Sequence, residues 1–120
     1  MEKIDVVKLV NQDARELENT MKNIFEKLLS MTDEEKFKNL KELIIEVSKK
    51  ATDDEYVKLC KTNLKLASNL DKDTLKAFLK LRMSVSNSLP EELAKKDAML
   101  LKKALEESEE TIRKKIQAAM

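Results

Sequence analysis

The stretch Leu79–Leu101, LKLRMSVSNSLPEELAKKDAMLL, decides the fold because it contains a helix boundary and two charged residues among leucines. The tetrapeptide SLPE at 88–91 combines a polar capping residue with a proline, which is tolerated only in the first turn of a helix. We therefore expect one helix to end near residue 87 and the next to begin at Pro90. Two helices joined by so short a link run back alongside each other.

Arg82 and Asp97 occupy the apolar faces of these two helices, each among leucine positions on a helical wheel. Because the chain reverses at residues 89 and 90, positions equally distant from that turn face each other, and Arg82 is placed opposite Asp97. We predict a partly buried ion pair that fixes the register of the hairpin. The alternative is that Arg82 extends to the surface with its stem over Phe78.

Three further helix starts divide the rest of the chain. The sequences TDEE at 32–35 and TDDE at 52–55 are capping boxes, and Asp71 precedes a third periodic run. The sequence thus predicts an all-α fold of about five helices with long first and last members, at 3–30, 33–50, 53–69, 72–87 and 90–118. Links of two or three residues favour an up-and-down antiparallel bundle. The pattern leaves open whether the first helix continues through Asn11 and Asn19.

The composition favours the same fold class. A chain of 120 residues fits one domain spanning 1–120, and a content of 39% charged residues with no glycine lacks the turn residues of a sheet protein. No apolar run approaches the ~20 residues that span a membrane. The single cysteine, Cys60, cannot form an internal disulfide, so we expect a cytoplasmic protein that does not enter membranes.

The residues of most catalytic sites are missing from the sequence. Without histidine the chain lacks the usual general base and the usual zinc or di-iron ligand, and without glycine it has no phosphate-binding loop. Cys60 is interpreted as a core residue and the acidic run at 106–110 as a solvated helix face. We predict that the protein is not an enzyme and has no catalytic residue, metal or cofactor, and no small-molecule substrate is indicated.

The length of the predicted terminal helices points to a partner. Each would extend about 42 Å, against about 26 Å for the inner three, so its ends overhang, fold back or meet another chain. Ile112 and Ile116 in the last helix have no obvious neighbour within a short bundle. We therefore expect a non-catalytic helical module for protein–protein interaction or oligomerisation, most simply a homodimer formed through these ends.

A ridge of lysines supports the alternative, a protein that binds nucleic acid or another polyanion. The lysine ridge lies on one face of the third helix and along the fourth, and consists of Lys58, Lys61, Lys65, Lys72, Lys76 and Lys80. Such a ridge can bind phosphates. Few arginines accompany it and no aromatic residues interleave with it, which weighs against recognition of bases.

Asn63 is a polar residue in the middle of the apolar face of the third helix. We interpret it as a residue that sets register or binds water. The alternative is that it contacts a ligand.

Overall fold

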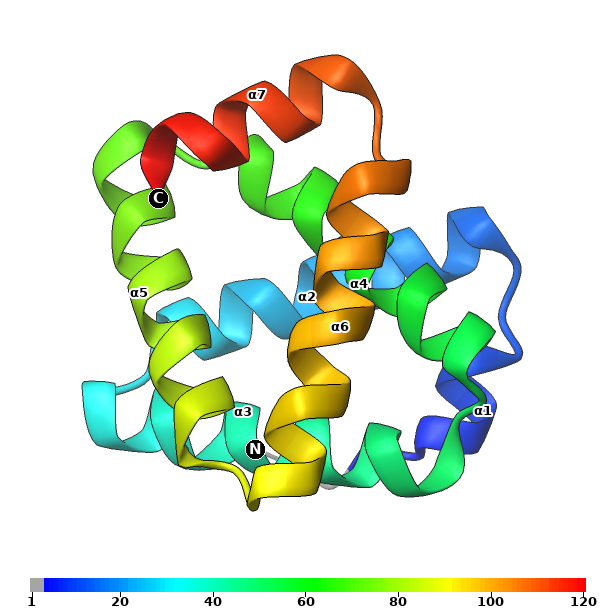
Figure 1. Ribbon diagram of the computed structural model, residues 1–120. Helices are drawn as coiled ribbons and strands as arrows, with labels where there is room; N and C mark the ends of the chain where they lie inside the picture. The colour runs from blue at the N-terminus through cyan, green and yellow to red at the C-terminus, as the bar shows by residue number, and fades with distance from the viewer. Residues whose placement is uncertain (1–3) are drawn as a thin grey trace.

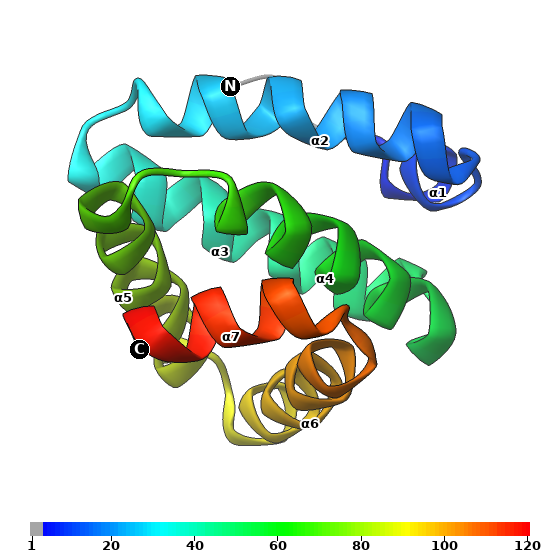
Figure 2. The same cartoon turned by 90° about the horizontal axis from the view of Figure 1, so that it is seen from above.

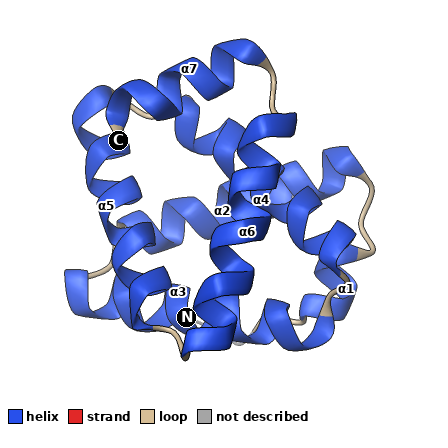
Figure 3. Cartoon of the chain, viewed as in Figure 1, coloured by secondary structure: helices blue, strands red, loops and turns tan. Residues whose placement is uncertain are grey.

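A computed structural model describes residues 4–120, and these residues form seven α-helices and no strand (Figures 1 and 3). The all-helical class predicted from the sequence is confirmed. The helices are α1 (Val6–Val10), α2 (Ala14–Leu29), α3 (Asp33–Lys50), α4 (Asp53–Ser68), α5 (Lys72–Ser88), α6 (Glu91–Glu107) and α7 (Glu110–Ala119).

Side-chain caps determine where the inner helices begin. Thr32 and Thr52 complete the two capping boxes, in which each hydroxyl accepts from the backbone N–H three residues on, at 3.2 Å. In return, the glutamate at that third position accepts from the threonine N–H. Asp71 caps α5 by accepting from the Thr74 N–H at 2.9 Å. As a result α3, α4 and α5 begin at the residues that the sequence predicted.

The predicted first helix is two helices, which corrects the sequence-based boundary. Asn11 ends α1, and Asp13 begins α2 from an extended conformation with its carboxylate accepting from the Glu16 N–H at 2.9 Å. Short polar side chains bind the nearby backbone well outside helices, and they therefore favour a break over a continuous helix. The predicted start at residue 3 lies outside the described residues.

The predicted last helix also divides, at Ser108. The backbone of Ser108 is extended, and its hydroxyl donates to the carbonyl of Ala104 at 2.7 Å. Arg113 donates from Nη1 to the carbonyls of Glu106 and Ser108, both at 3.3 Å. These bonds satisfy carbonyls that a continuous helix would pair internally. Consequently α7 turns away from α6 instead of prolonging it (Figure 1).

The predicted up-and-down bundle describes the arrangement only roughly, because the helices cross one another. The described chain measures 31 × 30 × 30 Å, shorter than the 42 Å expected of an uninterrupted terminal helix. Helix α4 lies at the centre, in contact with α2, α6 and α7, and α5 runs crosswise to α2 (Figures 1 and 2). The α5–α6 pair is joined at 89–90 and opens away from that turn, and α7 crosses its open end (Figure 1).

Both ends of the described chain fold back onto the core. Helix α1 packs against α3, and α7 packs against α4 and α5. Ile116 is only 2% exposed and Ile112 is partly buried against the core. Of the three outcomes considered for the terminal helices, the protein therefore adopts the folded-back one. In the stretch 4–120 no helix has both the length and the apolar character needed to cross a bilayer.

Candidate functional site

A pocket of about 280 Å³ lies between the crossing helices. Its wall is mostly apolar and receives side chains from α2 to α7, so that nearly the whole fold contributes to it. The aromatic rings of Phe25 and Phe78 form part of the wall, with their centroids 4.9 Å apart. The exposed lining residues Met83 on α5, Ala98 and Lys102 on α6, and Met120 after α7 place the mouth of the pocket between these three elements.

Arg82 and Asp97 form a two-pronged ion pair beside this pocket. Arg82 Nη2 lies 2.6 Å from Asp97 Oδ1, and Nη1 lies 2.9 Å from Oδ2. The Asp97 side chain is 1% exposed and that of Arg82 12% exposed. The two residues therefore face each other across the α5–α6 pair, as the reversal at residues 89 and 90 predicted.

Tyr56 on α4 also donates a hydrogen bond to Oδ1 of Asp97. Burial alone would raise the pKa of Asp97, but Arg82, through hydrogen bonds and charge, and the hydroxyls of Tyr56 and Ser86 outweigh it and hold the pKa below its usual value. Burial alone would lower the pKa of Arg82, but the hydrogen bonds and the charge of Asp97 outweigh burial and raise that pKa. At neutral pH the two residues are thus an ionised pair whose charges cancel.

Cys60 lines the same pocket as a neutral thiol. Burial raises its pKa to about 12, so the nucleophilic thiolate is scarce at neutral pH. Burial, followed by the hydrogen bond to Asp97, raises the pKa of the Tyr56 phenol above its usual range. Neither group is activated as a nucleophile or base, and the polar side chains of the pocket can hydrogen-bond a ligand.

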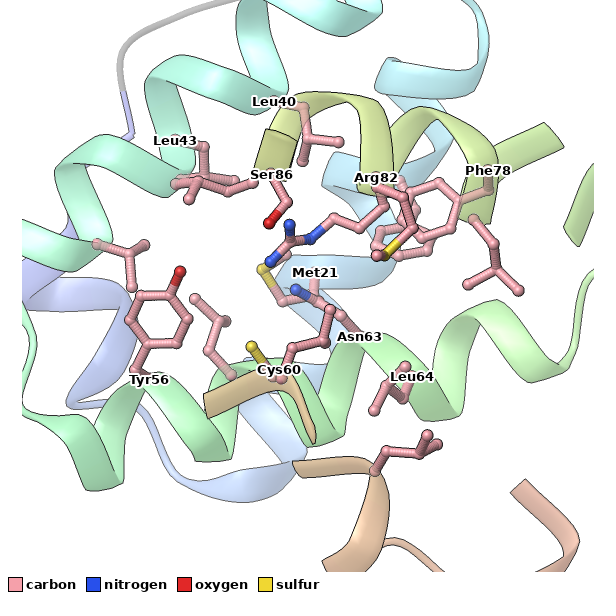
Figure 4. A pocket seen from close by; sticks show the side chains of 18 of the residues that line it. Met21, Leu40, Leu43, Tyr56, Cys60, Asn63, Leu64, Phe78, Arg82 and Ser86 are labelled. Atoms are coloured by element: carbon pink, nitrogen blue, oxygen red, sulfur yellow. The ribbon is translucent and has the colours of Figure 1, made fainter. Parts of the chain in front are cut away.

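Asn63 lies in the pocket wall with its amide unpaired. Its Oδ1 is buried without a hydrogen-bond partner, and in the described part of the chain its side chain makes no hydrogen bond. Figure 4 shows the Asn63 amide and the Arg82 guanidinium directed toward the middle of the pocket. An unpaired buried amide costs free energy unless another polar group meets it. The sequence marked Asn63 as anomalous on its helix face, and the pocket supplies the setting for it.

The lysine ridge is divided between two settings. Lys58 donates to the Gln12 carbonyl at 2.9 Å and so supports the link between α1 and α2. Lys65 pairs with Glu18 at 2.9 Å, and Lys61 lies 3.8 Å from Glu107. The α5 lysines at 72, 76 and 80 are exposed. The protein's own groups therefore occupy half of the ridge, whereas the row of three α5 lysines makes no ion pair with any other residue of the stretch 4–120.

Comparisons with protein-family models, with curated proteins and with solved structures give no match. Across residues 4–120, no cluster of three or more His, Cys, Asp or Glu side chains is placed to hold a metal ion. The candidate site therefore rests on the pocket and its polar side chains alone.

The pocket was not predicted from the sequence, because its apolar wall gives the same helical pattern as an ordinary core. Arg82 and Asn63, polar residues on apolar faces, were the available signals.

Proposed function

We propose that the protein is a non-catalytic binding protein that holds a small apolar molecule in the pocket bounded by α5, α6 and α7. The observation that carries the proposal is the size and lining of that pocket. Protein interiors pack closely and contain few voids larger than a water molecule. A space of about 280 Å³ is nearly twice the ~150 Å³ of an apolar cavity that accommodates benzene. A molecule of two fused aromatic rings, or of similar volume, therefore fits.

The interaction module expected from the sequence is less well supported. Its argument rested on apolar side chains of the terminal helices without a neighbour, and Ile112 and Ile116 pack inside the fold. Two of the large exposed apolar residues, Met83 and Met120, lie at the pocket mouth. Flexible methionine side chains adapt to ligands of varied shape, which favours a ligand at this opening. The homodimer stays a separate prediction, and the molar mass in solution, measured by light scattering, tests it.

The polyanion-binding alternative also has weaker support. Lys58 and Lys65 are engaged by groups of the same chain, and exposed lysines are the commonest surface cations of this sequence. The row on α5 lacks the aromatic side chains that stack on bases. A small apolar ligand accounts for the pocket and for the methionines at its mouth, whereas a polyanion accounts for neither.

Naphthalene is a suitable first probe because it has the required volume and no head group. We expect it to raise the melting temperature (Tm), followed by circular dichroism, in a concentration-dependent way. A ligand at one hundred times its Kd adds about 2.7 kcal/mol to the free energy of unfolding. A Tm that stays constant up to the solubility limit of naphthalene would contradict the proposal.

Two neighbouring tryptophan substitutions localise the binding. Ala98→Trp places a large ring at the mouth, and we expect naphthalene affinity to fall at least tenfold. Met99→Trp is the matched control, since Met99 is 59% exposed and does not line the pocket. It is expected to bind as the wild type does. Equal binding by both variants would show that naphthalene occupies another place and would overturn the assignment.

A further inference from the structure

The apolar wall of the pocket is interrupted by a polar cluster drawn from α4 and α5. Tyr56, Cys60 and Asn63 come from α4, and Arg82 and Ser86 come from α5. Figure 4 shows the polar groups of Asn63 and Arg82 at the middle of the pocket, with leucine and phenylalanine side chains beyond them. A ligand filling the pocket therefore meets a polar region as well as an apolar one.

The polar cluster carries no net charge. The guanidinium of Arg82 is matched by Asp97 at 2.6 and 2.9 Å, and the phenol of Tyr56 is neutral. An ionised head group brought from water would be an uncompensated charge in a largely apolar site, which is costly. Lys102 at the mouth is exposed, so a carboxylate that reached it would remain in water and gain little.

The unpaired amide of Asn63 adds a second criterion. The Asn63 Oδ1 is enclosed by protein atoms, so the amide offers a pocket ligand its N–H groups, and a hydroxyl can accept a hydrogen bond from them. An ammonium group only donates and cannot pair with these N–H groups, whereas a carboxylate accepts as a hydroxyl does and is disfavoured by its charge. A hydroxyl can also accept from N–H groups of Arg82, which has five donors and gives two of the described bonds to Asp97. Charge and hydrogen-bonding capacity thus favour the same head group.

We infer that the pocket selects neutral amphiphiles, an apolar body of about ten carbon atoms ending in a hydroxyl or a similar neutral group that accepts a hydrogen bond from Asn63. This inference rests on the proposed function and specifies the chemical class of its ligand.

Three probes of equal chain length test the inference: decan-1-ol, decanoate and decylamine, compared at pH 7 by calorimetric titration of the full chain. We expect decan-1-ol to bind at least tenfold more tightly than either charged analogue. Decanoate or decylamine binding as tightly as the alcohol would overturn the inference while leaving the proposed pocket intact. If naphthalene binds and none of the three decyl compounds does, the inference is likewise overturned and the proposed pocket stands. If naphthalene also fails to bind, the proposed function itself fails.

The variant Asn63→Leu tests the residue, because the leucine side chain has the same number and branching of heavy atoms as asparagine and lacks the amide. We expect affinity for decan-1-ol to fall about tenfold while affinity for naphthalene, which needs no head-group partner, stays within twofold. Naphthalene binding also shows that the variant is folded and retains its pocket. Unchanged decan-1-ol affinity, or an equal loss for both ligands, would overturn the role given to Asn63.

Discussion

Asp97 joins three helices at one carboxylate. It belongs to α6, accepts both prongs of Arg82 from α5, and accepts a further hydrogen bond from Tyr56 on α4. The sequence predicted the partner across the turn because a two-residue link fixes the register of neighbouring helices. It could not predict Tyr56, since the contact between α4 and α6 depends on a crossing angle that no local pattern encodes.

Removing one partner of the ion pair is expected to be far more damaging than removing both. Asp97→Asn or Arg82→Met each leaves a buried charged group without its counter-ion, at a cost of about 3–5 kcal/mol in the free energy of unfolding. The double variant Arg82→Met/Asp97→Leu removes both charges, so we expect it to recover most of that loss. Urea unfolding of the single and double variants measures this. Single variants within about half a kcal/mol of the wild type would contradict a structural role.

The ion pair also gives a defined dependence on pH. Because the folded pKa of Asp97 is held below that of the unfolded chain, its contribution is fully present above the unfolded value of about 3.9. It is lost as pH falls through the lower folded pKa, where the native carboxylate must take up a proton. We expect the wild type to lose stability relative to Arg82→Met/Asp97→Leu below about pH 4. Parallel pH profiles from pH 7 to 2 would contradict this.

Helix boundaries followed the sequence wherever a side chain capped the backbone in a recognisable motif. The threonine boxes predicted α3 and α4, but continuity at Asn11 and Asn19 was left open. The sequence DARE at 13–16, an aspartate cap followed three residues later by glutamate, is the local signal for the start of α2. The break at Ser108 had even less local signal. There Arg113 binds the freed carbonyls from the following helix, an interaction visible only once α7 has turned back.

The cap of α2 is open to a direct test at Asp13. Asp13→Ala removes the acceptor for the Glu16 N–H, and we expect the Tm to fall by roughly 4 °C, the effect of losing a typical cap in a domain of this size. Asp13→Asn is the matched control because asparagine caps about as well as aspartate. It is expected to stay within about 1 °C of the wild type. Equal losses for both variants would assign the effect to charge and not to capping.

For the molecule as a whole, composition and periodicity predicted the helical class correctly. The predicted arrangement was wrong at the terminal helices. Two breaks, at Asn11–Asp13 and at Ser108, convert two long rods into four shorter helices that cover the core. The predicted up-and-down bundle required consecutive helices to run antiparallel alongside each other. In the folded molecule α5 and α6 diverge from their turn (Figure 1), and residues of both helices line the pocket. That divergence arises from packing across the whole chain.

The links between helices use only ordinary backbone shapes: among residues 4–120, none has a positive φ. Asn11, Ser30 and Asn69 end their helices in the right-handed region, at φ of −88°, −83° and −88°. Such conformations are open to almost every amino acid, whereas a left-handed cap demands glycine or asparagine. The amino acids tolerated in a link are therefore limited by the hydrogen bonds of its capping side chains and not by the backbone conformation. A link position that neither caps a helix nor packs in the core can therefore exchange residue types while the path of the chain stays the same.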